Sequence, residues 1–281
     1  MPDLRTTPED MPVNAIRGYL DMTAKMINQY RPDRIVACLD GDALPSWRVN
    51  LFPGYKAMRQ KATGTGEPEL LKPQIPVLLE LIKRFRIPLV KLDDYEADDL
   101  LASYAHQHPG PIRIATGDRD LFQSVDDKRD VKVIYLARGF AQHELVDYAY
   151  IQQKYGIPGD QYTLYALLRG DSSDGLPGVA GIGNKGAALI ANNFATLDGL
   201  VAAAQNGDPL LPAALGRKIL ADIEYVRIAP KVIQVARDAQ LPDIDVTMPI
   251  LPKDLSAIME YKEKYGLGSS VDRLVSAFNS R

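Results

Sequence analysis

Apolar residues in the first half of the chain form short runs that alternate with helical patterns. Residues 13–30 carry apolar side chains at helical spacing, and the sequence Arg31-Pro32-Asp33 ends this pattern. The run RIVACLD at 34–40 is short and rich in β-branched residues, which is typical of a strand buried on both faces. Further strand-like runs lie at 87–92, 112–117 and 131–136, and further helical patterns at 73–86 and 96–107.

Strands that alternate with helices predict a parallel sheet, and such sheets bind ligands beyond the carboxyl ends of their strands. Acidic residues directly follow three of these strands. Asp40 comes after the first strand, Glu96 and its neighbours come after the second, and Asp118 with Asp120 comes after the third. We therefore expect carboxylates from separate segments to meet at one edge of the sheet.

The strand pattern stops near residue 143, and the remaining sequence is typical of short helices joined by polar or glycine-rich turns. We expect an α/β domain over residues 1–150 and a helical domain over residues 151–281. No low-complexity linker and no sharp change in composition marks the boundary between them.

The composition narrows the function classes. The chain has 281 residues and a net charge of −3, which excludes a surface that is basic all over, so any contact with nucleic acid has to be local. A single cysteine, Cys38, excludes an internal disulfide. No apolar run approaches the roughly 20 residues that span a bilayer, and no secretory signal is present, so we expect a cytoplasmic protein that does not contact membranes.

Charge is unevenly distributed along the chain. Residues 43–66 contain no acid but carry Arg48, Lys56 and Arg59 among aromatic residues, whereas residues 93–99 contain five acids. A solvated basic face explains the basic segment as well as a binding surface does. The acidic crowding needs a partner of opposite charge.

Eight carboxylates are candidates for one site. Any one of them alone could oppose a helix dipole, cap a helix or form a turn. Two carboxylates about 4 Å apart repel by roughly 4 kcal/mol at an effective dielectric near 20, so a cluster of them either raises pKa values or binds cations. The candidates are Asp40, Glu96, Asp98, Asp99, Asp118, Asp120, Asp171 and Asp174.

The acidic motifs contain no histidine or cysteine at ligand spacing. Ligation by oxygen alone suits two or more Mg²⁺ or Mn²⁺ ions rather than zinc. A pair of such ions can bind a phosphate, activate water and stabilise the leaving oxygen, so the pattern favours phosphodiester hydrolysis.

The stretch GLPGVAGIGNKGAALI contains three closely spaced glycines, Gly178, Gly181 and Gly183, with Lys185 in the first turn of the helix that follows. A simple helix–helix turn would explain glycines with positive φ. Gly-x-Gly before a helix also exposes backbone N–H groups to a phosphate. We interpret residues 176–190 as a helix-hairpin-helix that holds the DNA backbone.

Five motifs resemble, in order and spacing, those of the 5′ nuclease family, which includes the 5′-3′ exonuclease domain of bacterial DNA polymerase I, stand-alone flap endonucleases and bacteriophage 5′ nucleases. The similarity runs from about residue 12 to at least residue 240. The motifs are ACLDGD at 37–42, FPGYKAMR at 52–59, YEADDL at 95–100, TGDRDLFQ at 116–123 and GDSSDGLPGVAGIGNKGAA at 170–188.

This resemblance implies a PIN-like parallel-sheet nuclease domain with a helical arch around residues 43–85, followed by a helix-three-turn-helix domain. It assigns the eight carboxylates to the metal site. It also implies that Lys56 and Arg59 contact the scissile and a neighbouring phosphate, that Tyr55 stacks on a terminal base, and that Arg48 contacts DNA. The glycine loop and Lys185 would hold the duplex, with K⁺ as a further cofactor at that loop.

The resemblance further implies a structure-specific 5′ nuclease, a monomer that cuts 5′ flaps, 5′ ends and RNA primers beside a DNA polymerase and a ligase in the bacterial nucleoid. This sequence has Gly175 where many relatives have asparagine, which we expect to shift a contact behind the metal ligands. Relatives also begin with an apolar strand ending in Asp-Gly. We expect Met1 to be an internal start, with catalysis reduced or absent in this form.

Two alternatives stay open. A phosphatase of the haloacid-dehalogenase type would explain the LDGD motif, but it has no use for a glycine hairpin. This sequence lacks the apolar strand ending in Asp-Gly with which relatives begin. A protein that binds flaps or junctions without cutting them would explain both this missing strand and the glycine hairpin.

Overall fold

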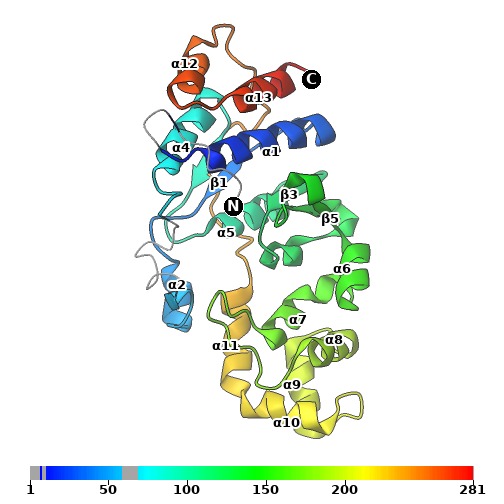
Figure 1. The fold of residues 1–281 in the computed structure, drawn as a ribbon. Coiled ribbons are helices and arrows are strands. Elements are labelled where there is room, and N and C mark those ends of the chain that lie inside the picture. The colour runs from blue at the N-terminus through cyan, green and yellow to red at the C-terminus, as the bar shows by residue number, and fades with distance from the viewer. Residues whose placement is uncertain (1–6, 8–10, 59–68, 281) are drawn as a thin grey trace. The chain divides into compact units, whose positions relative to one another are not determined.

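The computed structural model describes residue 7 and residues 11–58 and 69–280. The chain divides into two compact units (Figure 1). Unit 1 combines three stretches, Met1–Leu39, Gln60–Val90 and Pro242–Arg281, and unit 2 combines Asp40–Arg59 with Lys91–Leu241. Both units are discontinuous in sequence, and the linear boundary near residue 150 stays a prediction.

Unit 1 is built around helix α1, whose apolar positions recur at helical spacing and are buried at Ile16, Leu20 and Ile27. Helix α1 packs against α13 and α4, and α4 contacts α12. The helices are α1 (Asn14–Tyr30), α4 (Gln74–Arg84), α12 (Ser256–Lys264) and α13 (Ser269–Asn279), and the strands are β1 (Ala37–Leu39) and β2 (Leu89–Lys91).

Unit 2 contains a three-stranded sheet in the order β3-β4-β5. Strands β3 (Ile112–Thr116) and β4 (Val131–Tyr135) are parallel, with Ile112 opposite Val131 and Thr116 opposite Tyr135. Strand β5 (Glu144–Val146) joins β4 in the antiparallel direction. The sequence pattern around residue 144 suggested helix, and it missed β5 because a strand of three residues is too short to show alternation.

The helical part of unit 2 follows the sheet as predicted. Helix α8 packs on α7, α10 on α9, and α11 on both α7 and α2. The helices that follow the sheet are α6 (Tyr148–Tyr155), α7 (Tyr162–Arg169), α8 (Asn184–Asn193), α9 (Leu197–Asn206), α10 (Ala213–Ala221) and α11 (Ile223–Ile233), and α2 (Ser46–Leu51) and α5 (Ala97–Gln107) precede it.

The four predicted parallel strands do not form one sheet. Among the described residues, β1 pairs with β2 and β3 pairs with β4, in two separate sheets. The mixed α/β class is therefore confirmed, and the single four-stranded sheet is wrong for the described residues.

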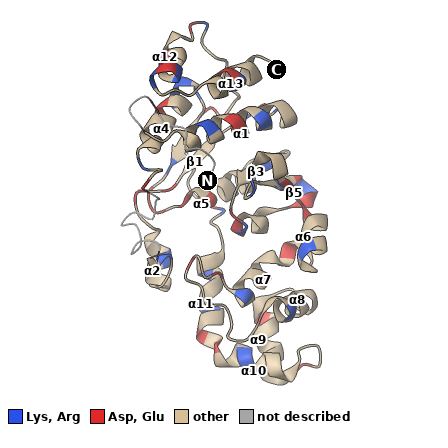
Figure 2. Ribbon diagram, in the orientation of Figure 1, with Lys and Arg blue, Asp and Glu red and all other residues tan. Residues whose placement is uncertain are grey.

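Charge of both signs is distributed over the helices (Figure 2), in agreement with the small net charge. No individual helix within the described ranges combines the length and the apolar composition that crossing a membrane requires. The bent pair α8 and α9 passes that test only when its two helices are taken together.

Candidate active site

The acidic cluster is organised by the start of α5. Glu96 is the N-cap residue, and its backbone N–H donates to Asp99 Oδ2 at 3.0 Å, which completes a capping box. Asp98 and Asp99 lie in the first turn, where negative charge opposes the helix dipole. Because neighbouring helical residues point about 100° apart, these two carboxylates face different surroundings.

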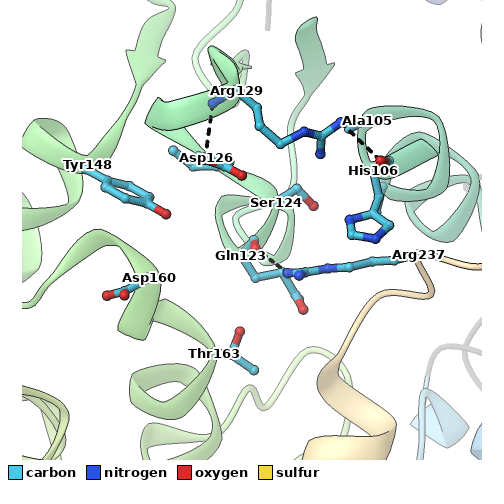
Figure 3. Close-up of a pocket in the computed structure, with 12 residues that line it drawn as sticks. Ala105, His106, Gln123, Ser124, Asp126, Arg129, Tyr148, Asp160, Thr163 and Arg237 are labelled. Atoms are coloured by element: carbon cyan, nitrogen blue, oxygen red, sulfur yellow. Dashed lines mark hydrogen bonds between the residues drawn. The ribbon is translucent and has the colours of Figure 1, made fainter. Parts of the chain in front are cut away.

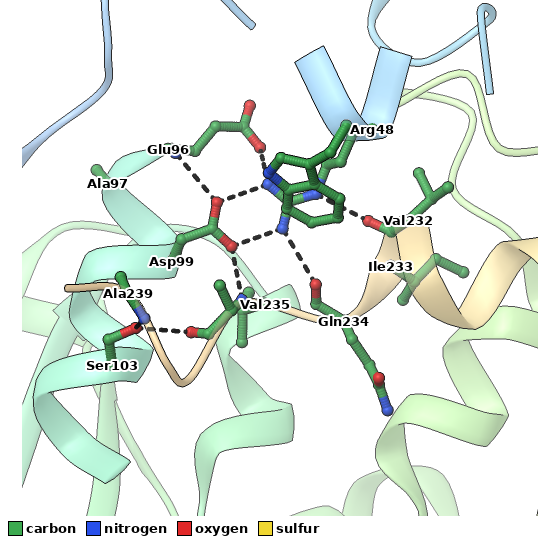
Figure 4. Close-up of polar contacts among 12 residues, drawn as sticks. Arg48, Glu96, Ala97, Asp99, Ser103, Val232, Ile233, Gln234, Val235 and Ala239 are labelled. Atoms are coloured by element: carbon green, nitrogen blue, oxygen red, sulfur yellow. Dashed lines mark hydrogen bonds and ion pairs between the residues drawn. The ribbon is translucent and has the colours of Figure 1, made fainter. Parts of the chain in front are cut away.

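Asp99 faces the interior and binds Arg48 (Figure 4). Nη1 and Nη2 of Arg48 donate to Oδ2 and Oδ1 of Asp99, both at 2.6 Å. Arg48 also donates to the carbonyl oxygens of Val232 at 3.0 Å and Gln234 at 3.1 Å. The pair therefore fastens α2 and α5 to the end of α11.

This buried pair affects two predicted roles. Burial disfavours the charge of Arg48, but the hydrogen-bonded carboxylate of Asp99 outweighs it and raises the pKa of Arg48. Asp99 also accepts from the backbone N–H of Ala236 at 2.7 Å. Arg48 is 2% exposed and Asp99 is 0% exposed, and protein groups already occupy the side chains of both.

Tyr55 and Lys56 approach the cluster from the basic segment. The Tyr55 hydroxyl donates to Glu96 Oε2 at 2.6 Å, and its ring is buried rather than presented for stacking on a base. Lys56 Nζ donates to Glu96 Oε1 at 2.7 Å and lies 3.7 Å from Asp174 Oδ2. Lys56 therefore places a positive charge between two carboxylates.

Gly175 allows the basic segment to approach the loop around Asp174. The backbone N–H of Lys56 donates to the Asp174 carbonyl at 2.9 Å. Gly175 has φ +77°, and a Cβ atom there would lie 2.4 Å from the carbonyl oxygen of Gly54. Glycine is therefore required at this position by close backbone contact as well as by its dihedral angle.

Five predicted carboxylates line one small cavity of about 10 Å³, which is the room of about one water molecule. They come from three separated segments: the start of α5, the turn after β3, and the loop before the glycine run. The carboxylates are Glu96, Asp98, Asp118, Asp120 and Asp174, and Arg48, Tyr55 and Lys56 line the same cavity.

The cavity strongly perturbs two carboxyl groups. Burial, followed by the charges of Asp118 and Asp40, raises the pKa of Asp98 to about 7. Burial, followed by the charges of Asp118 and Asp174, raises the pKa of Asp120 to about 7. The positive charge of Lys56 opposes the increase in both pKa values, but burial and the charges of the neighbouring carboxylates outweigh it.

Asp118, which lines the cavity, and Asp40 and Asp171, which do not, each accept hydrogen bonds from nearby groups. Asp118 Oδ1 accepts from the Asp120 backbone N–H at 2.9 Å, and Asp40 Oδ1 accepts from the Ala97 N–H at 2.7 Å. Asp171 Oδ1 accepts from Ser173 N–H at 2.8 Å and Ser173 Oγ at 2.6 Å. Burial alone would raise the pKa of Asp171, but the hydrogen bonds from Ser173 outweigh it and lower that pKa.

The site fits divalent cations in chemistry but does not form a closed ligand shell. No group of three or more His, Cys, Asp or Glu side chains within residues 11–58 and 69–280 has the geometry to hold a metal ion. The lining carboxylates supply only oxygen donors, which suit Mg²⁺ or Mn²⁺. Burial and the neighbouring carboxylates raise the pKa values of Asp98 and Asp120, and divalent ions would oppose both effects by favouring the ionised carboxylates.

Part of the predicted arch lies outside the described residues. Arg59, the second predicted phosphate contact, is among residues 59–68, which the structure does not describe. The role of Arg59 and the arch over residues 43–85 stay predictions.

Gly178 has a packing role. Its φ is +70°, and a Cβ atom there would lie 2.6 Å from the carbonyl carbon and oxygen of Arg169. Its backbone N–H donates to the Tyr225 hydroxyl at 3.2 Å, and that hydroxyl donates to the Leu167 carbonyl at 3.2 Å. The N–H of Gly178 is therefore used inside the protein rather than left for a phosphate.

The rest of the glycine loop is tied to α10 and the start of α11. Lys218 Nζ donates to the Gly181 carbonyl at 2.6 Å, and Asp222 Oδ2 accepts from the Ala180 N–H at 2.6 Å. Lys218, Asp222 and Tyr225 were not among the predicted residues. They come from α10, from the residue between the two helices and from α11, so no single helical face could have identified them in the sequence.

Gly183 and Lys185 lie at the beginning of α8. Gly183 is the N-cap residue and provides no side-chain cap, and both residues are exposed. The first N–H groups of a helix have no partner within the helix, so this end presents donors together with the Lys185 ammonium. Contact of this end with DNA stays a prediction.

A second cavity in unit 2, of about 170 Å³, lies apart from the carboxylates and contains none of the predicted residues (Figure 3). Arg129 Nη2 donates to the His106 carbonyl at 3.0 Å, and Arg237 Nη2 donates to the Gln123 carbonyl at 2.8 Å. Asp126 and Asp160 balance these arginines, so the lining has no dominant charge.

Comparison with known families agrees with this fold. A model of the 5′-3′ exonuclease N-terminal resolvase-like domain matches residues 1–156, and a model of the 5′-3′ exonuclease C-terminal SAM fold matches residues 157–253. A 5′-3′ exonuclease of Streptomyces coelicolor is 41% identical over 286 residues, which cover 100% of this chain and 95% of that protein. A 5′-3′ exonuclease of Mycobacterium tuberculosis is 38% identical, covering 100% and 93%.

Solved structures show the same architecture. The bacteriophage T5 5′-exonuclease with bound zinc has a TM-score of 0.60 at 16% identity, covering 94% of this chain and 89% of that chain. Human GEN1 in complex with Holliday junction DNA has a TM-score of 0.62 at 16% identity, covering 96% and 66%. The resolvase-like domain and the helical SAM fold define the class as a PIN-type nuclease. The chain belongs to the 5′-3′ exonuclease family.

Proposed function

We propose that this protein is a structure-specific nuclease that hydrolyses DNA phosphodiesters at 5′ flaps and 5′ ends, RNA primers included, with bound divalent cations. The observation that carries this proposal is the cavity lined by five carboxylates, two of which have pKa values raised to about 7. Perturbed acids that gather in one cavity are typical of catalytic sites. The phosphatase alternative explains neither this cavity nor the family membership.

Asp98, Asp118, Asp120 and Asp174 are the residues that we propose to hold Mg²⁺ or Mn²⁺, with Glu96, Asp40 and Asp171 around them. When bound, two or more such ions supply Lewis-acid activation of the phosphate and of water. We leave Asp99 out of this set because Arg48 and two backbone N–H groups already bond its carboxylate.

Of the two cations that line the cavity, Arg48 and Lys56, Lys56 is the one that we propose to contact the substrate. Its ammonium lies beside Glu96 and Asp174, where it can donate to the scissile phosphate and stabilise negative charge that develops there. Arg48 acts through its neighbours, because it holds α2 and α5 together with all its described contacts inside the protein. We do not propose that Arg48 or Tyr55 contacts DNA, since both are buried.

The glycine loop and the start of α8 are the proposed surface for duplex DNA, with Gly183 and Lys185 exposed there. Structural neighbours support a DNA substrate: they include T5 D15 flap endonuclease in complex with DNA and metal ions, and the catalytic core of Rad2 in complex with DNA substrate. We propose that the protein acts as a monomer beside a DNA polymerase and a ligase, in the bacterial cytoplasm at the nucleoid. K⁺ at the glycine loop would have to compete with Lys218 for the Gly181 carbonyl.

A labelled 5′-flap duplex tests the proposal. We expect cleavage near the junction with Mg²⁺ or Mn²⁺, none with a chelator, and none on a matched 3′-flap duplex. Asp120→Asn is the site variant, and the exposed Asp254→Asn, whose carboxylate caps Ser256 in unit 1, is the matched control. Cleavage that persists in the chelator would contradict the metal site.

Binding of the flap without cleavage would instead support a flap-binding protein with impaired catalysis. One observation favours this second candidate: the described residues contain no ready-made metal-ligand group. A titration with Mn²⁺ separates the two candidates, because an intact but open site recovers activity at high metal concentration whereas an impaired site does not.

A further inference from the structure

We propose that Lys218 is a DNA-backbone contact and the built-in cation of the glycine loop. This inference rests on the proposed function, because the phosphate that Lys218 would contact belongs to the duplex DNA that we propose to bind at the glycine loop. Lys218 lies on α10, outside every motif that the sequence singled out. Its ammonium donates to the Gly181 carbonyl at 2.6 Å, which fixes its position on the loop.

Two further side chains make the loop rigid around this contact. The Asp222 carboxylate accepts from Ala180 N–H at 2.6 Å, and the Tyr225 hydroxyl accepts from Gly178 N–H at 3.2 Å. The loop is therefore held at three points, by α10, by the residue between α10 and α11, and by α11. A phosphate that binds here does not have to order the loop, so little affinity is lost to that cost.

The remaining backbone donors of the loop identify where the phosphate lies. Val179 N–H donates to the Leu168 carbonyl and Ile182 N–H donates to the Val179 carbonyl, both at 2.9 Å. With Gly178 and Ala180 also engaged, the donors left at this end of the loop are near Gly181 and at the start of α8. Lys218 is bound to Gly181 itself.

The charge of Lys218 is not cancelled by its contact. Its observed partner is a neutral carbonyl oxygen, and its side chain makes no ion pair with an acid within the described part of the chain. An ammonium has three N–H donors, and this contact uses one of them. The other two, with the full positive charge, are left for a phosphate oxygen or water.

The same geometry predicts how the loop responds to salts. A K⁺ ion at the loop would need carbonyl oxygens as ligands, and the Gly181 carbonyl already accepts a hydrogen bond from an ammonium. We therefore expect DNA binding by this chain not to require K⁺. Removing Lys218 should open that position to K⁺.

The test measures flap binding in chelator and flap cleavage in Mg²⁺ for the whole chain and for Lys218→Met. We expect Kd to rise on the order of tenfold and KM to rise with it, while kcat at saturating DNA stays unchanged. The slope of log Kd against log salt should decrease by about one, as for the loss of one phosphate contact. Replacing K⁺ with tetramethylammonium should weaken Lys218→Met further and leave the unmodified chain unchanged.

Three variants separate the contact from general effects. Arg217→Met removes a neighbouring exposed charge from the same helix that makes no described side-chain contact, and it should leave the salt slope unchanged. Lys218→Gln keeps a donor for the Gly181 carbonyl without the charge, and it should bind as weakly as Lys218→Met. Lys218→Arg should restore most of the affinity. Circular dichroism confirms that each variant is folded.

The outcomes distinguish this inference from the proposed function. If the unmodified chain neither binds nor cuts a 5′ flap, the proposed function fails. If it binds and cuts but Lys218→Met behaves like Arg217→Met, only the role of Lys218 is overturned. A K⁺ requirement in the unmodified chain equal to that of Lys218→Met would also overturn it.

Discussion

Arg48 and Asp99 form a bidentate ion pair in which both N–O distances are 2.6 Å and neither side chain is more than 3% exposed. Their positions are 51 residues apart in sequence, and the backbone around Val232 and Gln234 completes the contact. The pair connects the basic segment to the helix that carries Glu96 and Asp98.

Breaking this pair should strongly destabilise the protein. Asp99→Ala leaves the guanidinium buried without its main partner, so we expect a loss of about 3–5 kcal/mol in the free energy of unfolding. Urea denaturation measures it. The more exposed pair Arg113–Asp130 is the control, and Asp130→Ala should cost no more than about 1 kcal/mol. Equal losses at the two sites would contradict the structural role of the Arg48–Asp99 pair.

Without divalent metal, stability should decrease as pH rises toward neutrality. Asp98 and Asp120 have folded-state pKa values of about 7, against an ordinary value of 3.8 for the carboxyl group of aspartate, so the folded chain binds their protons more tightly than the unfolded chain. Between the unfolded-state pKa of 3.8 and the folded-state pKa of about 7, the folded state holds more protons than the unfolded state, and the free energy of unfolding falls as the pH rises. Thermal unfolding in chelator at pH 5 and pH 8 measures the effect.

The double variant Asp98→Asn with Asp120→Asn serves as the control for this prediction. It should lose at least about 1 kcal/mol of the pH dependence and be more stable than the unmodified chain at pH 8. Mg²⁺ should raise the melting temperature of the unmodified chain more at pH 8 than at pH 5, because it binds ionised carboxylates. An unchanged pH profile in the double variant would show that these groups do not carry it.

Lys56→Met should affect both catalysis and the resting site. Removing the ammonium beside Glu96 and Asp174 takes away the positive charge that opposes carboxylate repulsion, so we expect lower stability at pH 8 in chelator. Single-turnover cleavage should slow by roughly 10²–10³-fold, as for the loss of one donor to developing charge. Lys253→Met, an exposed lysine of unit 1, should change neither measurement.

Gly175→Ala should separate the basic segment from the Asp174 loop. Its Cβ would lie 2.4 Å from the Gly54 carbonyl oxygen, at a φ of +77° that alanine disfavours. We expect a loss of about 1–3 kcal/mol in stability together with weaker flap cleavage. Gly18→Ala is the matched control, since nothing lies within 4 Å of its Cβ position in helix α1 and alanine should stabilise it. A neutral Gly175→Ala would show that the two loops separate at little cost.

The sequence predicts which carboxylates line the cavity better than it predicts the roles of Asp99 and Arg48 beside them. Asp118 and Asp120 could be placed because a polar turn after a buried strand lies at the edge of the sheet, and Asp98 because it opens a helix there. Asp99, one residue further, could not be separated from Asp98. Asp99 faces the interior because it pairs with Arg48, and Arg48 lies 51 residues away in the sequence, so no local pattern shows the pair.

Glycine and aromatic positions show a second limit. The sequence correctly placed turns at Gly178 and Gly181, both of which have positive φ. It could not show that the Gly178 N–H is bonded to Tyr225, because that partner lies 47 residues away. We expected Tyr55 to stack on a base. Its hydroxyl instead donates to Glu96, which lies 41 residues away in the sequence, so the sequence does not show this contact.

The assembly of unit 1 from three separated stretches constrains how the chain folds during synthesis. The principal partner of α1 is α13, which begins at Ser269, so the first helix leaves the ribosome long before the last one exists. The sequence of unit 2 lies between the sequences of α1 and α13, so unit 2 can complete its own core earlier, because domains generally fold as units during synthesis. Helix α4 can cover part of α1 early, but the apolar surface that packs against α13 stays uncovered until nearly the entire polypeptide is made, so this surface needs protection from aggregation in the nascent protein.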